Sequence, residues 1–324
     1  MNRLIFRVTF FLLLLSAPAF AQQKYAIVIH GGAGVMSKDK MTAGMQEAYL
    51  QKLNEALTTG EKMLKEGNKA ADVVIKVINI LEDSPLFNAG KGAVLNHEGK
   101  AELDASVMDG KTLKAGAIAG VRDIKNPINA ARAVMDYSDH VFLSGKGASE
   151  FARKQGLEMV PNHYFKTAQR KESLKQLKKK ERERLDKDNM GTVGCVVLDK
   201  NGDIFAGTST GGMNNKRYGR IGDTPVIGAG TYADNKTCGI SCTGHGEYFI
   251  RLSFARDVAA LMEYKNLSVA DACKTEIEKL GELKGTGGVI ALDKNGNIAM
   301  EFNTSGMFRG YIKSTGEKEV AIFK

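Results

Sequence analysis

Thr192 follows Gly191 in the middle of the chain, and this pair of residues could carry out nucleophilic chemistry. A threonine hydroxyl is a weak nucleophile until a nearby base removes its proton. Cleavage of the Gly191–Thr192 bond would give Thr192 a free α-amine, whose reference pKa of about 7.7–8.0 allows it to act as that base. One residue would then supply both nucleophile and base. The pair therefore predicts the self-cleaved precursor of an N-terminal-threonine amidohydrolase.

Two charged residues downstream could bind the free head of an amino acid. Arg220 and Asp223 are three positions apart and are surrounded by Gly219 and Gly222. Glycine lets the backbone approach a ligand closely. An arginine guanidinium binds a carboxylate in bidentate geometry, and an aspartate accepts hydrogen bonds from an ammonium group. Taken alone, such a pair would more often be an ordinary surface ion pair, so the assignment depends on the motifs around it.

Several sequence blocks, taken in order, resemble the plant-type asparaginase and isoaspartyl peptidase family of N-terminal nucleophile hydrolases. The blocks cover residues 29–34, 85–93, 103–110, 191–194, 208–216, 220–223, 242–247 and 302–304. Each block is unremarkable by itself, but their order and spacing make the resemblance specific. It extends over nearly all of the chain beyond residue 24.

The resemblance implies roles for further residues around the nucleophile. It implies that Thr210 and Thr243 polarise Thr192, and that Thr243 and the backbone N–H of Gly244 form the oxyanion site. Asn88 matches a family residue that lies near the nucleophile. The implied substrate-binding residues are Arg220, Asp223, Gly244 and Gly246, the last through its backbone carbonyl.

A loop near residue 85 resembles one that wraps a sodium ion with backbone carbonyls. The matching positions are Leu81, Glu82, Ser84, Phe87, Ala89 and Lys91. Carbonyl ligands leave almost no side-chain signature, so this site is implied by the resemblance alone. Lys91 stands where an apolar residue is expected, although only its carbonyl would bind the ion. No organic cofactor is expected.

The elements that must position these residues predict an α+β fold. Asn-Gly pairs between apolar runs indicate hairpins at 196–204 and 290–298. Hairpins combined with helices favour α+β layers over alternating βαβ units. Strands are predicted at 25–29, 105–109 and 115–121, and helices at 43–66, 69–82, from Asn126 onward, 247–262 and 269–279. The resemblance implies a four-layer αββα sandwich, in one domain, whose central strand begins at Thr192.

The chain divides into segments with different expected fates. Residues 1–21 combine a basic start, an apolar run too short to span a bilayer and a small-residue cleavage site, which predicts a signal peptide and export to the periplasm or beyond. Cleavage before Thr192 would leave an α chain of residues 22–191 and a β chain of residues 192–324. The resemblance implies that these assemble as (αβ)2.

Most of the positive charge is confined to a linker at about 166–190. Between residues 166 and 188, ten Lys or Arg outnumber five Asp or Glu, which accounts for +5 of the formal net charge of +9. This composition indicates a solvated helix or a disordered linker, and its position would let a mobile chain move away from the new terminus. No broad basic face is left for nucleic acid, and no membrane contact is expected after signal removal.

The four cysteines, Cys195, Cys238, Cys242 and Cys273, do not have the spacing of a metal site. Export would permit disulfides, but the sequence does not decide whether Cys238 pairs with Cys242.

The predicted substrates are β-aspartyl (isoaspartyl) dipeptides and L-asparagine, and two alternatives stay open. Glycosylasparaginase, which removes sugar from asparagine, usually carries Asp directly before the nucleophile, whereas this chain has Met190-Gly191. A non-catalytic amino-acid-binding protein would keep Arg220 and Asp223 but would need no cleavage.

Overall fold

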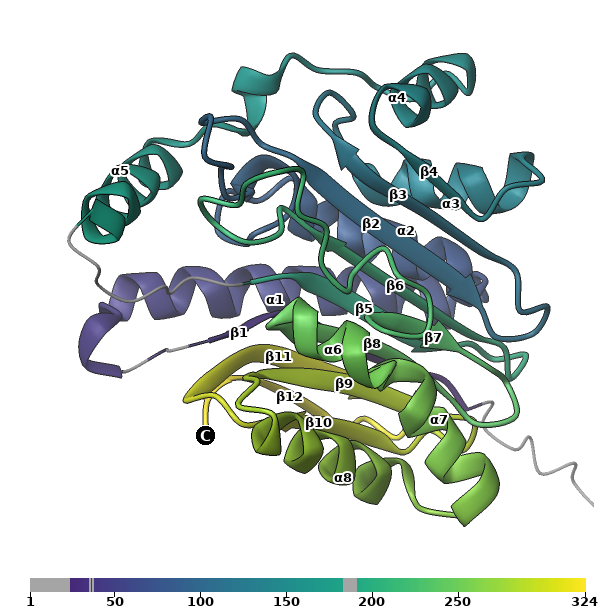
Figure 1. The fold of residues 1–324 in the computed structure, drawn as a ribbon. Coiled ribbons are helices and arrows are strands. Elements are labelled where there is room, and N and C mark those ends of the chain that lie inside the picture. Colours follow the sequence, from purple (N-terminus) through teal and green to yellow (C-terminus); the bar gives the residue numbers. More distant parts are fainter. Residues whose placement is uncertain (1–23, 35, 37, 183–190) are drawn as a thin grey trace, which may run out of the picture.

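The computed structural model describes residues 24–34, 36, 38–182 and 191–324, and its strands form two stacked sheets. Helices cover the outer face of each sheet, so the layers run helix, sheet, sheet, helix (Figure 1). The predicted α+β class and αββα sandwich are thereby confirmed. The predicted signal peptide and the end of the linker, residues 183–190, lie outside the described residues.

The larger sheet has eight strands and contains the predicted central strand. In spatial order they are β12 (Lys318–Phe323), β11 (Gly306–Lys313), β1 (Ala26–Gly34), β5 (Val193–Leu198), β6 (Ile204–Thr210), β2 (Leu103–Asp109), β3 (Ala115–Val121) and β4 (Phe142–Ser144). Neighbours are antiparallel except β3 and β4. Every residue of β5 is buried, which explains its continuous apolar run.

The smaller sheet has four antiparallel strands that pack against the middle of the larger one. They are β10 (Ile298–Phe302), β9 (Gly287–Asp293), β8 (Cys238–Gly244) and β7 (Thr231–Ala233). The apolar layer between the sheets includes Val28, Val196 and Ile290. The two Asn-Gly hairpins predicted from the sequence are confirmed, since they join β5 to β6 and β9 to β10.

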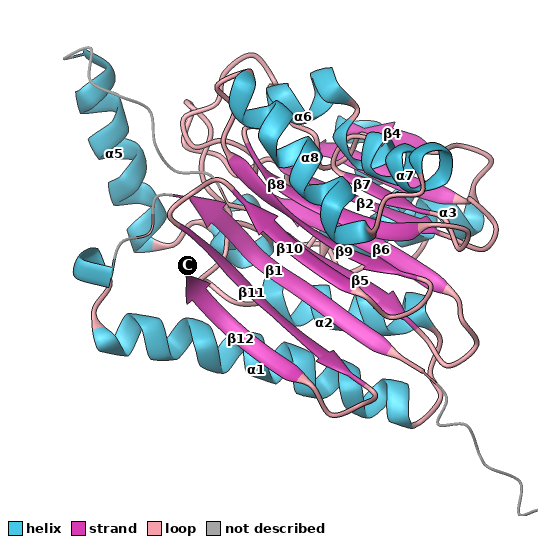
Figure 2. Ribbon diagram, turned by 90° about the horizontal axis from the view of Figure 1, so that it is seen from below, coloured by secondary structure: helices cyan, strands magenta, loops and turns pink. Residues whose placement is uncertain are grey.

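Helices α1 (Ala43–Lys65), α2 (Ala70–Glu82) and α3 (Pro127–Tyr137) pack on the larger sheet, and α4 (Gly145–Lys154) lies beside β3 and β4. Figure 2 shows α1 and α2 along one face of that sheet and α8 (Val269–Glu282) over the smaller sheet. The apolar stripe of α2, which includes Val73, Val77 and Ile78, is fully buried. Burying such a side chain contributes about 1.5–3 kcal/mol.

One predicted helix, 247–262, is wrong because the chain breaks it at Ser253. Two helices occupy this region, α6 (Gly246–Leu252) and α7 (Phe254–Lys265), and Ser253 between them has a left-handed φ of 49°. Phe249 and Phe254 are both fully buried, with ring centroids 4.7 Å apart. On an unbroken helix, residues five apart would point about 140° away from each other. The break lets both rings enter one core.

The charged linker forms helix α5 (Ala168–Arg182) in its described part, which is one of the two states that its composition indicated. Its inner face touches the body of the protein. Arg170 Nε donates to the carbonyl of Gly92 at 2.6 Å, and Asn214 Nδ2 donates to Ser173 Oγ at 2.9 Å. The mobility of the linker stays a prediction.

No helix in the described part of the chain is long and apolar enough to cross a membrane. All four cysteines are buried and unpaired, which answers the question that the spacing of Cys238 and Cys242 left open. Within the same described ranges, no cluster of three or more His, Cys, Asp or Glu side chains could hold a metal ion.

Candidate active site

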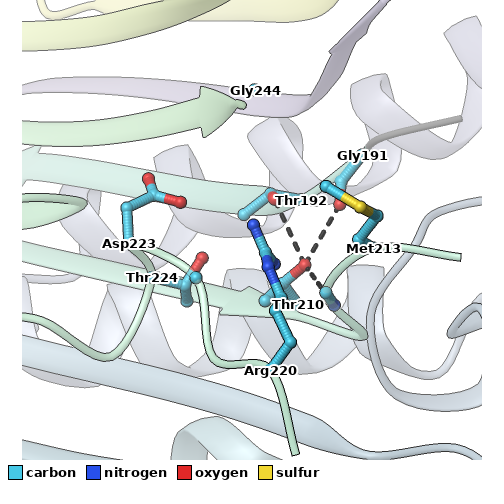
Figure 3. Close-up of a pocket in the computed structure, with 10 residues that line it drawn as sticks. Gly191, Thr192, Thr210, Met213, Arg220, Asp223, Thr224 and Gly244 are labelled. Carbon is cyan, nitrogen blue, oxygen red and sulfur yellow. Dashed lines mark hydrogen bonds between the residues drawn. The ribbon is translucent and has the colours of Figure 1, made fainter. Parts of the chain in front are cut away.

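Thr192 lies directly before strand β5, still joined to Gly191, and both line a small pocket (Figure 3). The pocket walls also include Thr210, Gly212, Met213, Arg220, Gly222, Asp223, Thr224 and Gly244. The structure therefore brings together Thr192 and most of the residues predicted from the sequence. Their segments converge because β5 and β6 are neighbours, while β8 lies in the opposite sheet.

Thr210 connects the hydroxyl of Thr192 to the peptide bond before it. The pairing of Val193 with Ser209 brings the end of β6 beside Thr192. Thr192 Oγ1 donates to Thr210 Oγ1 at 3.2 Å, and Thr210 Oγ1 donates to the Gly191 carbonyl at 3.1 Å. The N–H of Gly212 holds Thr210 Oγ1 from the other side at 3.0 Å. The Thr192 hydroxyl and the Gly191 carbonyl thus share one hydroxyl partner, Thr210.

Asn88 supplies a second donor to the same carbonyl. Its Nδ2 donates to the Gly191 oxygen at 2.6 Å and to the Gly212 oxygen at 2.8 Å. Its Oδ1 accepts from the N–H of Val94 at 2.8 Å, so both ends of the amide are held in place. Two fixed donors on one carbonyl oxygen can stabilise negative charge that develops there.

The second half of strand β1 packs against the Gly191–Thr192 peptide. Gly32 has a φ of +111°, and a Cβ there would lie 3.0 Å from the Cα of Gly191, so only glycine fits this close approach. His30 Nδ1 lies 3.1 Å from the Thr192 carbonyl, and Nε2 lies 2.9 Å from Ser241 Oγ. A carbonyl can only accept, so Nδ1 carries the proton. Burial lowers the pKa of His30 to about 3, so the ring is neutral at physiological pH.

A chain of buried hydroxyls continues from His30 between the two sheets. Ser241 Oγ lies 2.7 Å from Thr208 Oγ1, Thr231 Oγ1 donates to Thr208 Oγ1 at 2.6 Å, and Ser106 Oγ donates to Thr231 Oγ1 at 2.8 Å. These residues were not predicted, because isolated Ser and Thr are ordinary in strands. Since each buried hydroxyl finds a partner, the chain fixes how the sheets meet behind Thr192.

Arg220 is bound by a residue that the sequence did not single out. Its Nε donates to Glu247 Oε1 at 2.8 Å, and its Nη2 donates to Oε2 at 2.9 Å. Asp223 is buried, and its Oδ2 has no hydrogen-bond partner among the described residues. Burial raises the pKa of Asp223 to about 7. An unpartnered carboxyl oxygen in a pocket wall is suited to bind a cationic ligand.

Two glycines at and just after the end of β8, Gly244 and Gly246, lie near these charges. A Cβ on Gly246 would lie 2.7 Å from Asp223 Oδ1 and 2.9 Å from Arg220 Nη2, so a side chain there would displace both groups. Gly244, with a φ of +147°, lines the pocket directly. Thr243 is fully buried, and its hydroxyl accepts from the N–H of Ala33 at 3.3 Å.

The predicted sodium loop is a tight turn of buried carbonyls. A Cβ on Gly90 would lie 2.4 Å from the Glu82 oxygen, and one on Gly92 would lie 2.1 Å from the Phe87 oxygen. Leu81, Glu82, Ser84, Phe87 and Ala89 are buried, whereas Lys91 is exposed. The loop folds closely on itself at these two glycines, and a sodium ion held by its carbonyls stays a prediction. Glu82 Oε1 also accepts from Ser209 Oγ at 2.6 Å, which ties the loop to β6.

Comparison with known proteins gives consistent matches over most of the chain. Residues 23–322 match the sequence model of the asparaginase family. The isoaspartyl peptidase of Escherichia coli is 49% identical over 297 residues, which cover 89% of this chain and 92% of that protein. The plant-type L-asparaginase of Pyrococcus furiosus is 42% identical over 311 residues, covering 91% and 98%. The isoaspartyl peptidase/L-asparaginase of Bos taurus is 40% identical over 291 residues, covering 87% and 91%.

Proposed function

Since the chain belongs to the asparaginase family, we propose that it hydrolyses the β-amide bond of β-aspartyl dipeptides and L-asparagine and releases L-aspartate. One observation carries the proposal: a single pocket is lined by the Thr192 nucleophile, the Arg220 cation and the Asp223 carboxyl. These groups match the reacting amide, the α-carboxylate and the α-ammonium of such substrates. The names of the E. coli and Bos taurus relatives support the same activity.

The first reaction in this proposal is cleavage of the chain itself. The Thr192 hydroxyl attacks the Gly191 carbonyl carbon, and its proton passes to the departing amine. Negative charge on the Gly191 oxygen is stabilised by Asn88 Nδ2 and Thr210 Oγ1, which already donate to that atom. The C–N bond breaks to give an ester, which water hydrolyses. The products are the chain that ends at Gly191 and the chain that begins at Thr192.

The new α-amine of Thr192 then serves substrate hydrolysis. It takes the hydroxyl proton as Oγ1 attacks the substrate β-carbonyl, and the leaving amine departs with a proton. The backbone N–H of Gly244, together with Thr243, is the proposed oxyanion site. Arg220 binds the α-carboxylate, and Asp223 with the Gly246 carbonyl binds the α-ammonium. Water releases L-aspartate from the acyl-enzyme and restores Thr192.

The proposal also includes features that surround the site. Carbonyls of Leu81, Glu82, Ser84, Phe87, Ala89 and Lys91 would hold a sodium ion. The ion would stiffen the loop that carries Asn88, whose amide must stay on the Gly191 carbonyl. Residues 1–21 would direct export and be removed, and the cleaved chains would assemble as (αβ)2.

Intact-mass analysis of purified wild-type protein beside Thr192→Ala tests the proposal. We expect two wild-type fragments, one beginning at Thr192, and an uncut mutant. The cleaved protein should release L-aspartate from L-asparagine and from a β-aspartyl dipeptide. Release from N-acetylglucosaminyl-asparagine alone would favour glycosylasparaginase. A wild-type chain that stays whole under all maturation conditions would favour the amino-acid-binding alternative.

A further inference from the structure

The guanidinium of Arg220 is held along one of its edges before any ligand is present. Glu247 takes the Nε and Nη2 hydrogens in a bidentate pair, at 2.8 and 2.9 Å. A guanidinium has five N–H donors in a planar fork, so the edge formed by Nη1 and the second Nη2 hydrogen is still available. The pair with Glu247 thus leaves N–H donors of Arg220 that could bind a second carboxylate.

Glu247 holds Arg220 from outside the pocket. Arg220 lines the pocket, and Figure 3 shows its side chain extending towards Thr192, whereas Glu247 is not a lining residue. Glu247 is half exposed, with 49% of its side chain accessible against 19% for Arg220. The hydrogen bonds from Arg220 lower the pKa of Glu247, which keeps the carboxylate ionised. Arg220 thus lines the same pocket as Asp223 and Gly244, while its partner Glu247 does not.

The loop that carries Arg220 projects into solvent. Residues 217–219 and Ile221 are exposed, and Tyr218 is completely so. Tyr218 and Gly219 both have a positive φ, of 57° and 66°. A long side chain on such a loop loses considerable rotamer freedom when it is fixed for binding. The pair with Glu247 already restricts the rotamers of Arg220, so less entropy is lost when a ligand binds.

Glu247 also connects the loop that carries Arg220 to the segment that follows Gly244. It lies in the first turn of α6, directly after the strand β8 that ends at Gly244. We propose that Glu247 is a positioning residue that aims the free edge of Arg220 at the α-carboxylate of the substrate. This inference rests on the proposed function, because it takes Arg220 as the group that recognises that carboxylate.

The opposite reading treats Glu247 as a competitor that the substrate carboxylate must displace. The two readings predict opposite changes in substrate affinity when Glu247 is replaced. Loss of a positioning residue weakens substrate binding, whereas loss of a competitor strengthens it. The free Nη1 edge favours positioning, because both carboxylates can be bound at once.

The substitution Glu247→Gln keeps the shape of the side chain and removes its charge. We expect the KM for L-asparagine and for a β-aspartyl dipeptide to rise about tenfold, the order expected for a charge-assisted pair weakened by partial exposure. We expect kcat and the rate of self-cleavage to stay within about twofold, because Glu247 touches neither Thr192 nor the Gly191 carbonyl. The preference for L-asparagine over its α-carboxamide should fall by the same factor as the affinity.

The matched control is Glu263→Gln, which weakens the pair of Glu263 with Arg256 at 2.9 Å, an ion pair on α7 and away from the pocket. Its KM should not change. A second variant, Glu247→Asp, keeps the charge on a shorter arm and should give an intermediate KM. A positioning role predicts this order, whereas a purely structural role would lower thermal stability and kcat together.

Calorimetric titration with L-aspartate separates this inference from the proposed function. We expect Glu247→Gln to raise the dissociation constant about tenfold relative to the cleaved wild type. Unchanged or tighter binding, or a KM that is unchanged or lower, would overturn the inference. If the cleaved wild type binds L-aspartate yet hydrolyses neither substrate, the proposed function fails while the effect of Glu247 is still measured.

Discussion

The two walls of the pocket differ in how far their polar groups are satisfied. On the cleavage side, Thr192, Thr210 and Asn88 are joined by hydrogen bonds that converge on the Gly191 carbonyl. On the recognition side, Asp223 keeps a buried oxygen without a partner among the described residues, and Arg220 is held by a half-exposed Glu247.

This difference follows from what each side must bind. In the proposed mechanism the uncut chain is its own first substrate, so the Gly191 carbonyl is present when the cleavage side folds. The partner of the recognition side is a separate ligand, so a polar atom there lacks a hydrogen-bond partner within the described residues. A buried polar atom without a partner costs about 1–3 kcal/mol. We infer that the fold accepts this cost at Asp223 because the ligand ammonium offsets it.

The largest expected effect comes from removing the nucleophile on the cleavage side. Thr192→Ala should abolish both self-cleavage and amide hydrolysis, because the residue bonded directly to Gly191 would then carry no hydroxyl. Thr192→Ser keeps a hydroxyl and should still cleave, at a reduced rate. Gel analysis over several days measures both. Fragments from Thr192→Ala would show that another group performs the cleavage.

Removing one donor from the Gly191 carbonyl should have the next largest effect. Asn88→Asp keeps the acceptor for Val94 but loses both N–H donors, so self-cleavage should slow by about 10²–10³-fold. The control is Asn96→Asp, because buried Asn96 uses its Oδ1 to accept from the N–H groups of Glu98 and Lys100. Time courses of fragment formation compare the two. A change below threefold in Asn88→Asp would contradict the role of Asn88.

On the recognition side, the effect should depend on pH. Because burial raises the pKa of Asp223 to about 7, this group becomes neutral as the pH falls below that value. A neutral carboxyl binds an ammonium group poorly, so protonation of Asp223 should by itself lower kcat/KM for L-asparagine about tenfold per pH unit below pH 7. An N-terminal α-amine has a reference pKa of about 7.7–8.0 and would add its own loss of activity as the pH falls, so the comparison is with Asp223→Asn. That variant should lose activity and also lose the part of the pH dependence near pH 7. Identical profile shapes would assign the titration elsewhere.

Local signals explain which parts of the fold the sequence predicted. Asn-Gly turns and helical stripes are set by residues close in sequence, so the hairpin at 196–204 and helix α2 were found. The break at Ser253 was not, because it depends on two phenylalanines meeting in one core. Tertiary packing decided that boundary.

The same distinction holds within the site. The predicted site residues Thr192 and Thr210 meet because one directly precedes β5 and the other ends its neighbour β6. The pair of Arg220 and Glu247 spans 27 positions. A glutamate in the first turn of a helix already has a local explanation in the helix dipole, so nothing marked Glu247 as a partner. Side-chain pairs across loops are set by the assembled structure.

The smallest expected effect concerns Tyr218, the most exposed large side chain of the recognition side. If recognition depends on the guanidinium that Glu247 holds, the ring of Tyr218 should contribute little. Tyr218→Ala should therefore leave KM, kcat and self-cleavage within about a factor of two, as for other surface substitutions. Steady-state kinetics with L-asparagine and with β-aspartyl dipeptides of different leaving residues measures this. A KM that rises tenfold for the dipeptides alone would mean that the ring contacts the leaving residue, and recognition would then extend beyond the amino-acid head.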